Sequence, residues 1–167
     1  INGANNGTGV KVYIGGAEVA GTSVAIGGDG TITYTAGTTE ANGLLTVVDR
    51  AGNESTTSAS MRIDNTLPTT DAVTVGSIQL GGKTVLSGSG FNTGGDVTVL
   101  TIGGGVPAGM TFVVDGDGQI TITGGDGEVT DGQIIVTDQA NNLSVDPVYL
   151  TIDNTKPTVA SVTNSVI

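Results

Sequence analysis

Two short motifs, each present twice, hold the side chains of this chain that are best suited to binding a metal ion. The first motif, Asp-x-Ala-(Gly/Asn)-Asn, occurs at Asp49–Asn53 and at Asp138–Asn142. The second, Asp-Asn-Thr-x-Pro, follows at Asp64–Pro68 and at Asp153–Pro157. Carboxylate, side-chain amide and turn carbonyl oxygens form the ligand set that Ca²⁺ prefers, about six to eight oxygens at roughly 2.3–2.6 Å. The motifs therefore predict calcium binding.

The first motif precedes a turn that returns the chain to the last strand of a module, and the second motif ends that strand. The proline just beyond it stops the strand and stiffens the connection. We therefore expect both loops to converge at one pole of the module, beside the start of the next. A cation there would neutralise like charges and fix the angle between neighbouring modules. The predicted ligands are Asp49, Asn53, Asp64, Asn65, Asp138, Asn142, Asp153 and Asn154.

The alternative interpretation of these motifs is plain turn chemistry. Asp and Asn form turns readily because their side chains bond to nearby backbone N–H groups, so Asp-x-Ala-Gly-Asn also fits a tight hairpin. The Asn-x-Ser/Thr sequons at Asn6, Asn53 and Asn142 are acceptors for glycans in a eukaryotic or archaeal host, although turn composition is the favoured interpretation. Asp115-Gly116-Asp117-Gly118 is similar to the start of a calcium loop, but it lacks the later acidic positions. A hairpin turn is the favoured interpretation there.

Composition excludes several classes of function. The chain has no His, Cys or Trp, so the commonest general base, the soft metal ligands and the thiol nucleophile are all missing. Its formal charge is −11, from 16 acidic and 5 basic residues. Such a surface repels a phosphate backbone or an anionic membrane, so nucleic acid is not an expected partner. There is no run of 18 apolar residues, and we expect no membrane insertion in this segment.

An internal repeat organises the chain. Asp49 aligns with Asp138 and Asp64 with Asp153, both at an offset of 89 residues. Upstream the offset is 88: Ile14-Gly15-Gly16 matches Ile102-Gly103-Gly104, and Asp29-Gly30 matches Asp117-Gly118. A single-residue insertion must therefore lie between the two blocks. A period near 89 is too long for a solenoid and close to the roughly 100 residues of an immunoglobulin-type sandwich.

The repeat also gives module boundaries. Residues 1–65 form a partial immunoglobulin-like module that lacks its first strand or strands, because Ile1 aligns near Ser89. Residues 66–154 form a complete module, and residues 155–167 are a linker and the first strand of a further copy. The chain thus has the pattern expected of a window from a longer array.

Period-2 alternation indicates strands throughout. Val10, Val12 and Ile14 alternate with polar or aromatic neighbours, and Ile120 and Ile122 alternate with threonines. With so few aromatic residues, the core must consist mainly of Val, Ile and Leu. We expect an all-β fold of tandem immunoglobulin-like β-sandwich modules.

The pattern Val-Val-Asp-Arg-Ala-Gly-Asn-Glu-Ser, followed by Ile-Asp-Asn-Thr-Leu-Pro-Thr, resembles bacterial immunoglobulin-like domains repeated in large adhesins and in some S-layer proteins. The resemblance spans both copies, although Asn141 stands where the family has Gly. The low-complexity Gly/Thr middle of each module leaves the strand count open. The resemblance implies secretion, tandem arrangement and often calcium at the linkers.

These observations favour a structural role in a secreted prokaryotic cell-surface protein: an S-layer, a surface filament or an adhesin stalk. Its partners would be neighbouring modules or copies of itself. One alternative is a ligand- or carbohydrate-binding adhesin module that recognises host or surface glycans, with Tyr13, Tyr34, Tyr149, Phe91 and Phe112 as the available aromatic platforms. Another is a strand-exchanging filament subunit, in which the tail completes the first module of another molecule.

We expect no enzymatic activity. Asp115 and Asp117 are the nearest candidates for an acidic pair, but they lie on a Gly-rich turn with no apolar shell to raise a pKa.

Overall fold

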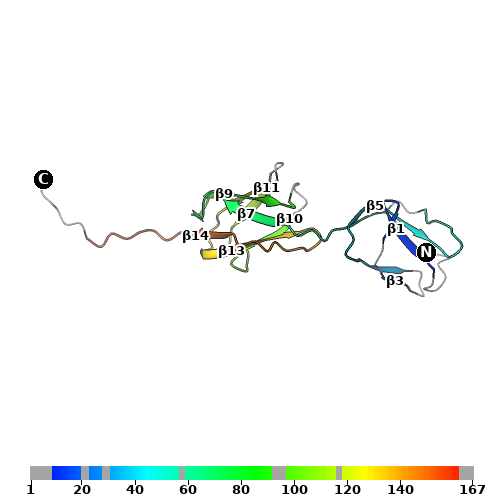
Figure 1. Cartoon of the computed structure of the whole chain (residues 1–167). Helices are drawn as coiled ribbons and strands as arrows, with labels where there is room; N and C mark the ends of the chain where they lie inside the picture. Colours follow the sequence, from blue (N-terminus) through cyan, green and yellow to red (C-terminus); the bar gives the residue numbers. More distant parts are fainter. Residues whose placement is uncertain are drawn as a thin grey trace. The chain divides into compact units, whose positions relative to one another are not determined.

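The computed structural model describes residues 9–19, 23–27, 31–56, 59–91, 97–115 and 118–161 of the chain. Every regular element in these ranges is a β-strand, and they contain no helix, so the all-β prediction is confirmed. The chain divides into two compact units, residues 1–65 and 66–167 (Figure 1). The repeat places a module boundary at the same point. We call them unit 1 and unit 2 and describe each by itself.

Unit 2 is built from two four-stranded sheets. Their orders are β11-β12-β9-β7 and β10-β13-β14-β8, and every pairing is antiparallel except the parallel contact of β14 with β8. Figure 1 shows β9 and β11 in one layer and β13 and β14 in the other. The strands are β7 (Thr69–Val73), β8 (Ser77–Ile78), β9 (Lys83–Ser89), β10 (Val97–Ile102), β11 (Thr111–Val114), β12 (Ile120–Thr123), β13 (Val129–Asp138) and β14 (Tyr149–Ile152).

The core of unit 2 lies between the two sheets. Alternate residues of each strand point inward, as period-2 alternation requires: Ile120 and Ile122 of β12 are fully buried, while Thr121 between them is not. Both sheets contribute to one apolar cluster, the arrangement of a β-sandwich. Its members are mainly aliphatic, as predicted from the shortage of aromatic residues, with Phe91 and Met110 as the exceptions.

Unit 1 repeats part of this arrangement. Its larger sheet has the order β2-β1-β5-β6, and β3 and β4 form a separate two-stranded sheet. The strands are β1 (Lys11–Ile14), β2 (Ala17–Glu18), β3 (Ser23–Ile26), β4 (Ile32–Thr35), β5 (Ala41–Val48) and β6 (Ser60–Ile63). Ile14, Val19 and Ile63 are buried, with partly buried Tyr34 and Leu45 packed against them. The described core is therefore smaller than that of unit 2.

A β-bulge accounts for the change of offset between the copies. In unit 1, β5 pairs with β6 without interruption, from Ala41 opposite Ile63 to Leu44 opposite Ser60. In unit 2, the register of β13 against β14 shifts between Val129 and Gly132, and Asp131 there has a φ of 44°. The extra residue of the second copy is thus absorbed inside the strand, and the offset becomes 89 beyond it.

The described part of the tail, residues 155–161, contains no strand and is exposed. The prediction that the tail opens a further module stays a prediction, because residues 162–167 lie outside the described residues. Asn6, Asp29 and Asp117 lie outside them too.

Candidate functional site

In unit 2 the Asp138–Asn142 motif forms a tight turn closed by its own first carboxylate. Asp138 Oδ1 accepts hydrogen bonds from the backbone N–H groups of Ala140 and Asn142, both at 2.8 Å. Asp138 Oδ2 accepts one from the Asn142 side-chain amide at 2.8 Å. Both carboxylate oxygens are engaged inside the turn, and Asp138 is only 5% exposed.

Unit 1 contains the same turn at the equivalent residues. Asp49 Oδ1 accepts from the N–H groups of Ala51 and Asn53 at 2.8 and 2.9 Å, and Oδ2 accepts from the Asn53 side-chain amide at 2.9 Å. Hydrogen bonds from the side chain and then the backbone of Asn53 hold the pKa of the Asp49 carboxyl below its usual range. For both aspartates, the hydrogen bonds of the carboxylate are those expected of a hairpin turn.

The left-handed residue of each turn explains why Asn141 stands in the second copy where the first copy has Gly52. Gly52 has a φ of 88° and Asn141, at the equivalent position, has a φ of 68°. Asn is one of the few residues with a side chain that adopts this conformation readily, so it replaces Gly here without changing the turn.

Two serines that sequence reasoning did not single out bond the segment after each turn to the strand before it. The Oγ atoms of Ser55 and Ser144 accept hydrogen bonds from the N–H groups of Val47 and Val136, both at 3.0 Å. The signal was present in the sequence, because both serines belong to the aligned segments at an offset of 89.

The prediction that the two motifs of a module converge at one pole is wrong. Because β13 and β14 are antiparallel and Val129 lies opposite Ile152, Asp153 adjoins the start of β13 while Asp138 is its last residue. Nine residues of strand at about 3.4 Å each separate the two ends by roughly 30 Å. Unit 1 has the same geometry, since Ala41 lies opposite Ile63 at the far end of β5 from Asp49.

The turn of unit 2 instead lies beside the start of its own unit, because the Asn142 side-chain amide donates to the Thr66 carbonyl at 3.3 Å. The amide nitrogens of Asn53 and Asn142, to which a glycan would be attached, both donate hydrogen bonds.

The second motif fastens loops at the opposite pole. Asn154 accepts from the Leu80 N–H at 2.6 Å and donates to the Gly125 carbonyl at 3.1 Å, and Asp153 accepts from the Thr155 N–H at 2.8 Å.

In unit 1 the equivalent residues have similar roles. The Asn65 amide donates to the Gly37 carbonyl at 3.4 Å. The Asp64 carboxylate forms an ion pair with Arg62 at 2.6 Å.

Within either unit these residues do not fit a calcium site. Each motif lies at a different pole, and the oxygens of Asp49 and Asp138 are occupied by turn donors. The described ranges hold no group of three or more acidic, His or Cys side chains that could hold a metal ion. Calcium binding by the chain stays a prediction.

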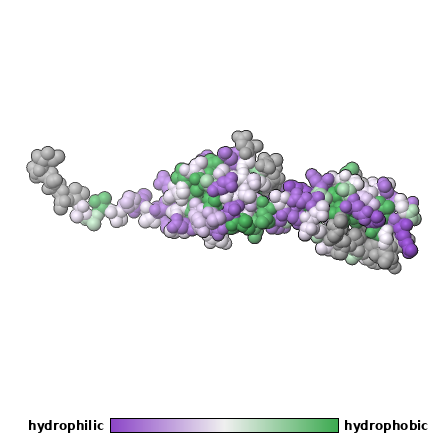
Figure 2. All heavy atoms as spheres, viewed as in Figure 1, coloured by the Kyte–Doolittle hydropathy of each residue, from purple (hydrophilic) through white to green (hydrophobic). Residues whose placement is uncertain are grey.

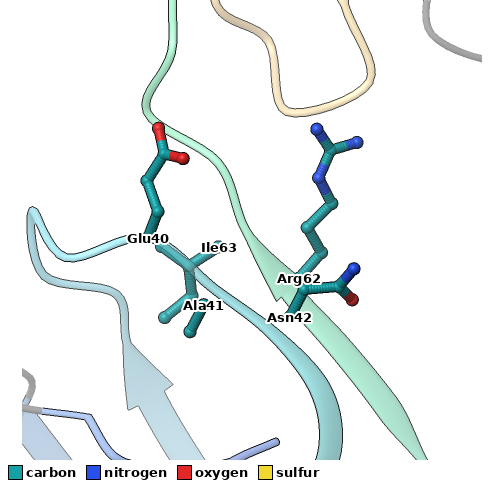
Figure 3. Close-up of a pocket in the computed structure, with 5 residues that line it drawn as sticks. All are labelled: Glu40, Ala41, Asn42, Arg62 and Ile63. Atoms are coloured by element: carbon teal, nitrogen blue, oxygen red, sulfur yellow. The ribbon is translucent and has the colours of Figure 1, made fainter.

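Two shallow depressions occur in the described surface. The first, of 210 Å³ in unit 1, is lined by Glu40, Ala41, Asn42, Arg62 and Ile63. Figure 3 shows Glu40 and Arg62 on either side of it, with Ala41 and Ile63 between them. The second, of 310 Å³, lies on the β7–β9 side of unit 2 and is lined by Ala72, Val73, Thr74, Val85, Ser87 and Gln119. Neither holds a nucleophile beside a general base.

The remaining candidate residues, the aromatic platforms for a sugar and the acidic residue Asp115, are dispersed. Tyr13 belongs to unit 1, where its hydroxyl donates to Glu18 at 3.4 Å, and Tyr149, 51% exposed, belongs to unit 2. Asp115 accepts a hydrogen bond from the Thr121 hydroxyl at 2.9 Å.

Hydrophobic groups interrupt the hydrophilic and neutral surface of both units in Figure 2. A search of the described residues for a helix long and apolar enough to cross a membrane finds none.

Comparison with known proteins shows only distant likeness. No family model matches the chain, and no curated protein matches it. Among solved structures it is similar to the Bacteroides ovatus mixed-linkage glucan utilization locus protein SGBP-B in complex with a mixed-linkage heptasaccharide. That match has 18% identity and a TM-score of 0.35 and covers 86% of this chain and 38% of the other.

The chain is also similar to the gamma-CGTase from an alkalophilic Bacillus clarkii, at 15% identity and a TM-score of 0.39. That match covers 88% of this chain and 21% of the other. The chain thus spans well under two thirds of either protein.

Proposed function

We propose that this chain is a structural, non-enzymatic pair of immunoglobulin-like modules from the extracellular part of a prokaryotic surface protein. The strand order of unit 2 supports the module type. Labelled from A to G, with β7 as A and β9 as B, one sheet has the order A-B-E-D and the other C-F-G, with the short β8 added beside β14. Immunoglobulin constant-type domains have this order.

One observation carries the structural role: the chain enters and leaves unit 2 at opposite ends of the same strand. Thr66 lies beside the Asn142 turn, just beyond the end of β13, and Asp153 adjoins its start at Val129. A module with entry and exit at opposite poles transmits tension along its strands. Tension then shears the parallel pair β8–β14 as a block instead of breaking its hydrogen bonds one at a time.

The distribution of repeated residues supports the same role. The residues that recur at offsets of 88 or 89 include several that build the fold: the turn aspartates, the serines that bond to the strand before the turn, and buried Ile63 and Ile152. Several exposed positions differ between the copies, as in Arg50 against Gln139 and Glu54 against Leu143. A duplicated binding site would repeat its exposed residues.

Single-molecule pulling tests this proposal. The chain lacks cysteine, so handles are attached at Leu67→Cys and Lys156→Cys for axial load. The matched control, Leu67→Cys with Ala140→Cys, loads two points at the same pole. We expect axial unfolding at a clearly higher force, with an extension near 300 Å because about 89 residues at roughly 3.5 Å each are released. Equal forces in the two geometries would count against a load-bearing role.

A second candidate, carbohydrate binding, is favoured by the depression on unit 2. It offers the Ser87 hydroxyl and the Gln119 amide beside the apolar Val85, the mixture of polar and apolar groups found in sugar sites. Calorimetric titration with a mixed-linkage heptasaccharide tests it, with Gln119→Ala as the variant and Gln139→Ala, outside the depression, as its control. Binding lost only in the first variant would support this function, and no heat of binding to the wild type would remove it.

A further inference from the structure

One outer surface of unit 2 carries apolar side chains in register across three neighbouring strands. In antiparallel pairing, residues directly opposite each other point to the same face of the sheet. The register therefore gathers three rows of side chains on β10, on β13 and on the segment that follows the turn. We call them the outer face of unit 2; the rows are Val99 with Thr137 and Leu143, Thr101 with Ile135, and Gln133 with Tyr149.

The outer face points away from the core. On β13 its members alternate with Ile134 and Val136, which are fully buried between the two sheets. Val99 is 41% exposed, Leu143 52% and Tyr149 51%. These three side chains present roughly 300 Å² of accessible surface, which is within the range of the largest apolar patches on soluble monomers, and such patches are often functional. In Figure 2, hydrophobic residues gather on the lower side of unit 2, the side of β13 in Figure 1.

Unit 1 shows that the fold does not require apolar residues at these positions. Its strands β1 and β5 pair in the equivalent register, with Val48 opposite Lys11 on one side and opposite Glu54 on the other. The offsets of 88 and 89 residues align Lys11 with Val99 and Glu54 with Leu143. Both ends of the row are therefore charged in unit 1 and apolar in unit 2. The apolar residues of unit 2 are not explained by the packing of their own module.

Charge favours a second copy of the chain as the occupant of the outer face. The chain has a formal net charge of −11, yet none of the seven residues of the face is charged. A twofold dimer brings a patch against itself, so a patch without charge is the one through which two acidic copies can approach most closely. A cationic partner would instead require acidic residues within the face.

Shape and size favour the same occupant. The face is the outer surface of adjacent strands about 4.8 Å apart, and two such surfaces pack against each other at about 10 Å. Neither of the two depressions described above includes a residue of this face. Two copies would bury about 1,000 Å² in total, which is the range of weak, reversible complexes.

We propose that two copies of this chain associate through the outer face of unit 2, sheet against sheet about a twofold axis. The occupant of the face is the same face of another molecule, and Val99, Leu143 and Tyr149 lie in the interface. The contact joins chains side by side. It goes beyond the proposed load-bearing role and stands whether or not that role holds.

Sedimentation equilibrium of the full chain tests the proposal. The wild type is compared with Leu143→Glu, which introduces the residue that unit 1 has at the equivalent position. The matched control is Leu80→Glu, because Leu80 is 62% exposed and lies outside the face. We expect the wild type to form dimers with a dissociation constant that Leu143→Glu raises by about tenfold or more, since one substitution enters a twofold interface twice and brings like charges together. Leu80→Glu should leave that constant unchanged within about twofold.

A second variant separates the effect of the face from the effect of net charge. Val99→Lys lowers the net negative charge of the chain, whereas Leu143→Glu raises it, and both should weaken the dimer. The melting temperature of unit 2 shows whether each variant stays folded. Raising the salt concentration from about 50 to 500 mM should strengthen the wild-type dimer, because salt screens the repulsion between two acidic chains.

Nuclear magnetic resonance of the wild type locates the contact without any substitution. With increasing concentration, the backbone amide shifts should change along β10, β13 and residues 143–149, whereas the equivalent strands β1 and β5 of unit 1 serve as an internal reference. The proposal is overturned if the chain stays monomeric at millimolar concentration, if the shifts change elsewhere, or if salt dissociates the dimer. It is equally overturned if Leu80→Glu weakens the dimer as much as Leu143→Glu.

Discussion

Replacing Asp138 with alanine removes the carboxylate that accepts three hydrogen bonds. The donors are the backbone N–H groups of Ala140 and Asn142 and the side-chain amide of Asn142. A hydrogen bond to a charged group contributes about 1.5–3 kcal/mol, and a buried donor left unpaired costs a similar amount. Water can reach the donor at exposed Ala140, which recovers roughly half of the loss. We expect Asp138→Ala to lower the free energy of unfolding of unit 2 by about 3 kcal/mol.

A donor–acceptor exchange makes this prediction specific. Asp138→Asn keeps an oxygen for the two backbone donors but turns an amide toward the Asn142 amide, so it should cost about 1 kcal/mol. The double variant D138N/N142D exchanges donor and acceptor and should recover part of that loss, because the hydrogen bond from the Asn142 amide to the Thr66 carbonyl is not restored. A coupling of this kind between neighbouring residues is measured by a double-mutant cycle.

Urea unfolding and calorimetry of the full chain provide the measurement, each carried out with calcium and with chelator. At roughly 4–8 °C per kcal/mol for a domain of this size, Asp138→Ala should lower the melting temperature of unit 2 by about 12–24 °C. A change below about 0.5 kcal/mol would refute the assignment of the turn as a stabilising element. A loss seen only with calcium present would restore the metal interpretation of Asp138.

Three further predictions concern both units. The pKa of Asp49 is depressed in the folded state, so its carboxylate stabilises unit 1 above the ordinary value of 3.8. That stabilisation is lost as the pH falls below 3.8 through the folded pKa. The free energy of unfolding of unit 1 should therefore fall less steeply with decreasing pH in Asp49→Asn. Leu86→Ala, in the core of unit 2, should cost about 2–5 kcal/mol by urea unfolding, whereas Leu44→Ala, 55% exposed, should cost less than about 0.5 kcal/mol. Gly43→Ala places a Cβ 2.5 Å from the Gly15 Cα at a φ of 143°, and should lower the melting temperature of unit 1; an unchanged value would show that the two strands can separate there.

Calcium is tested independently of any substitution. A ligand that binds only the folded state at a hundred times its dissociation constant raises stability by about 2.7 kcal/mol. Thermal unfolding of the wild type in calcium and in chelator therefore tests the predicted binding. A rise in melting temperature would confirm calcium binding by the folded chain, and no rise would end the calcium hypothesis.

The sequence predicts the strands and the core well, because alternation and the repeat are directly readable. Ile120 and Ile122 point inward as their spacing requires. The offset of 88 upstream and 89 downstream predicts a one-residue insertion, although it does not identify the bulge at Asp131.

The arrangement of the acidic motifs was not predictable in the same way. Their spacing along the chain does not reveal how far the long strand β13 carries Asp138 from the point where β14 ends. Residue type alone also cannot distinguish an aspartate that binds a cation from one that accepts its own backbone donors. That choice depends on the backbone of the turn, which places the N–H groups of Ala140 and Asn142 within reach of one oxygen.

The bulge in β13 has a consequence for how such a protein can change over time. A residue added within a regular strand would turn every later side chain to the opposite face and expose the core. In β13 the additional residue is confined between Val129 and Gly132, and Ile134 and Val136 beyond it remain fully buried. This point of the module therefore tolerates insertion and deletion. Neighbouring copies can drift in length there and still present the same interior.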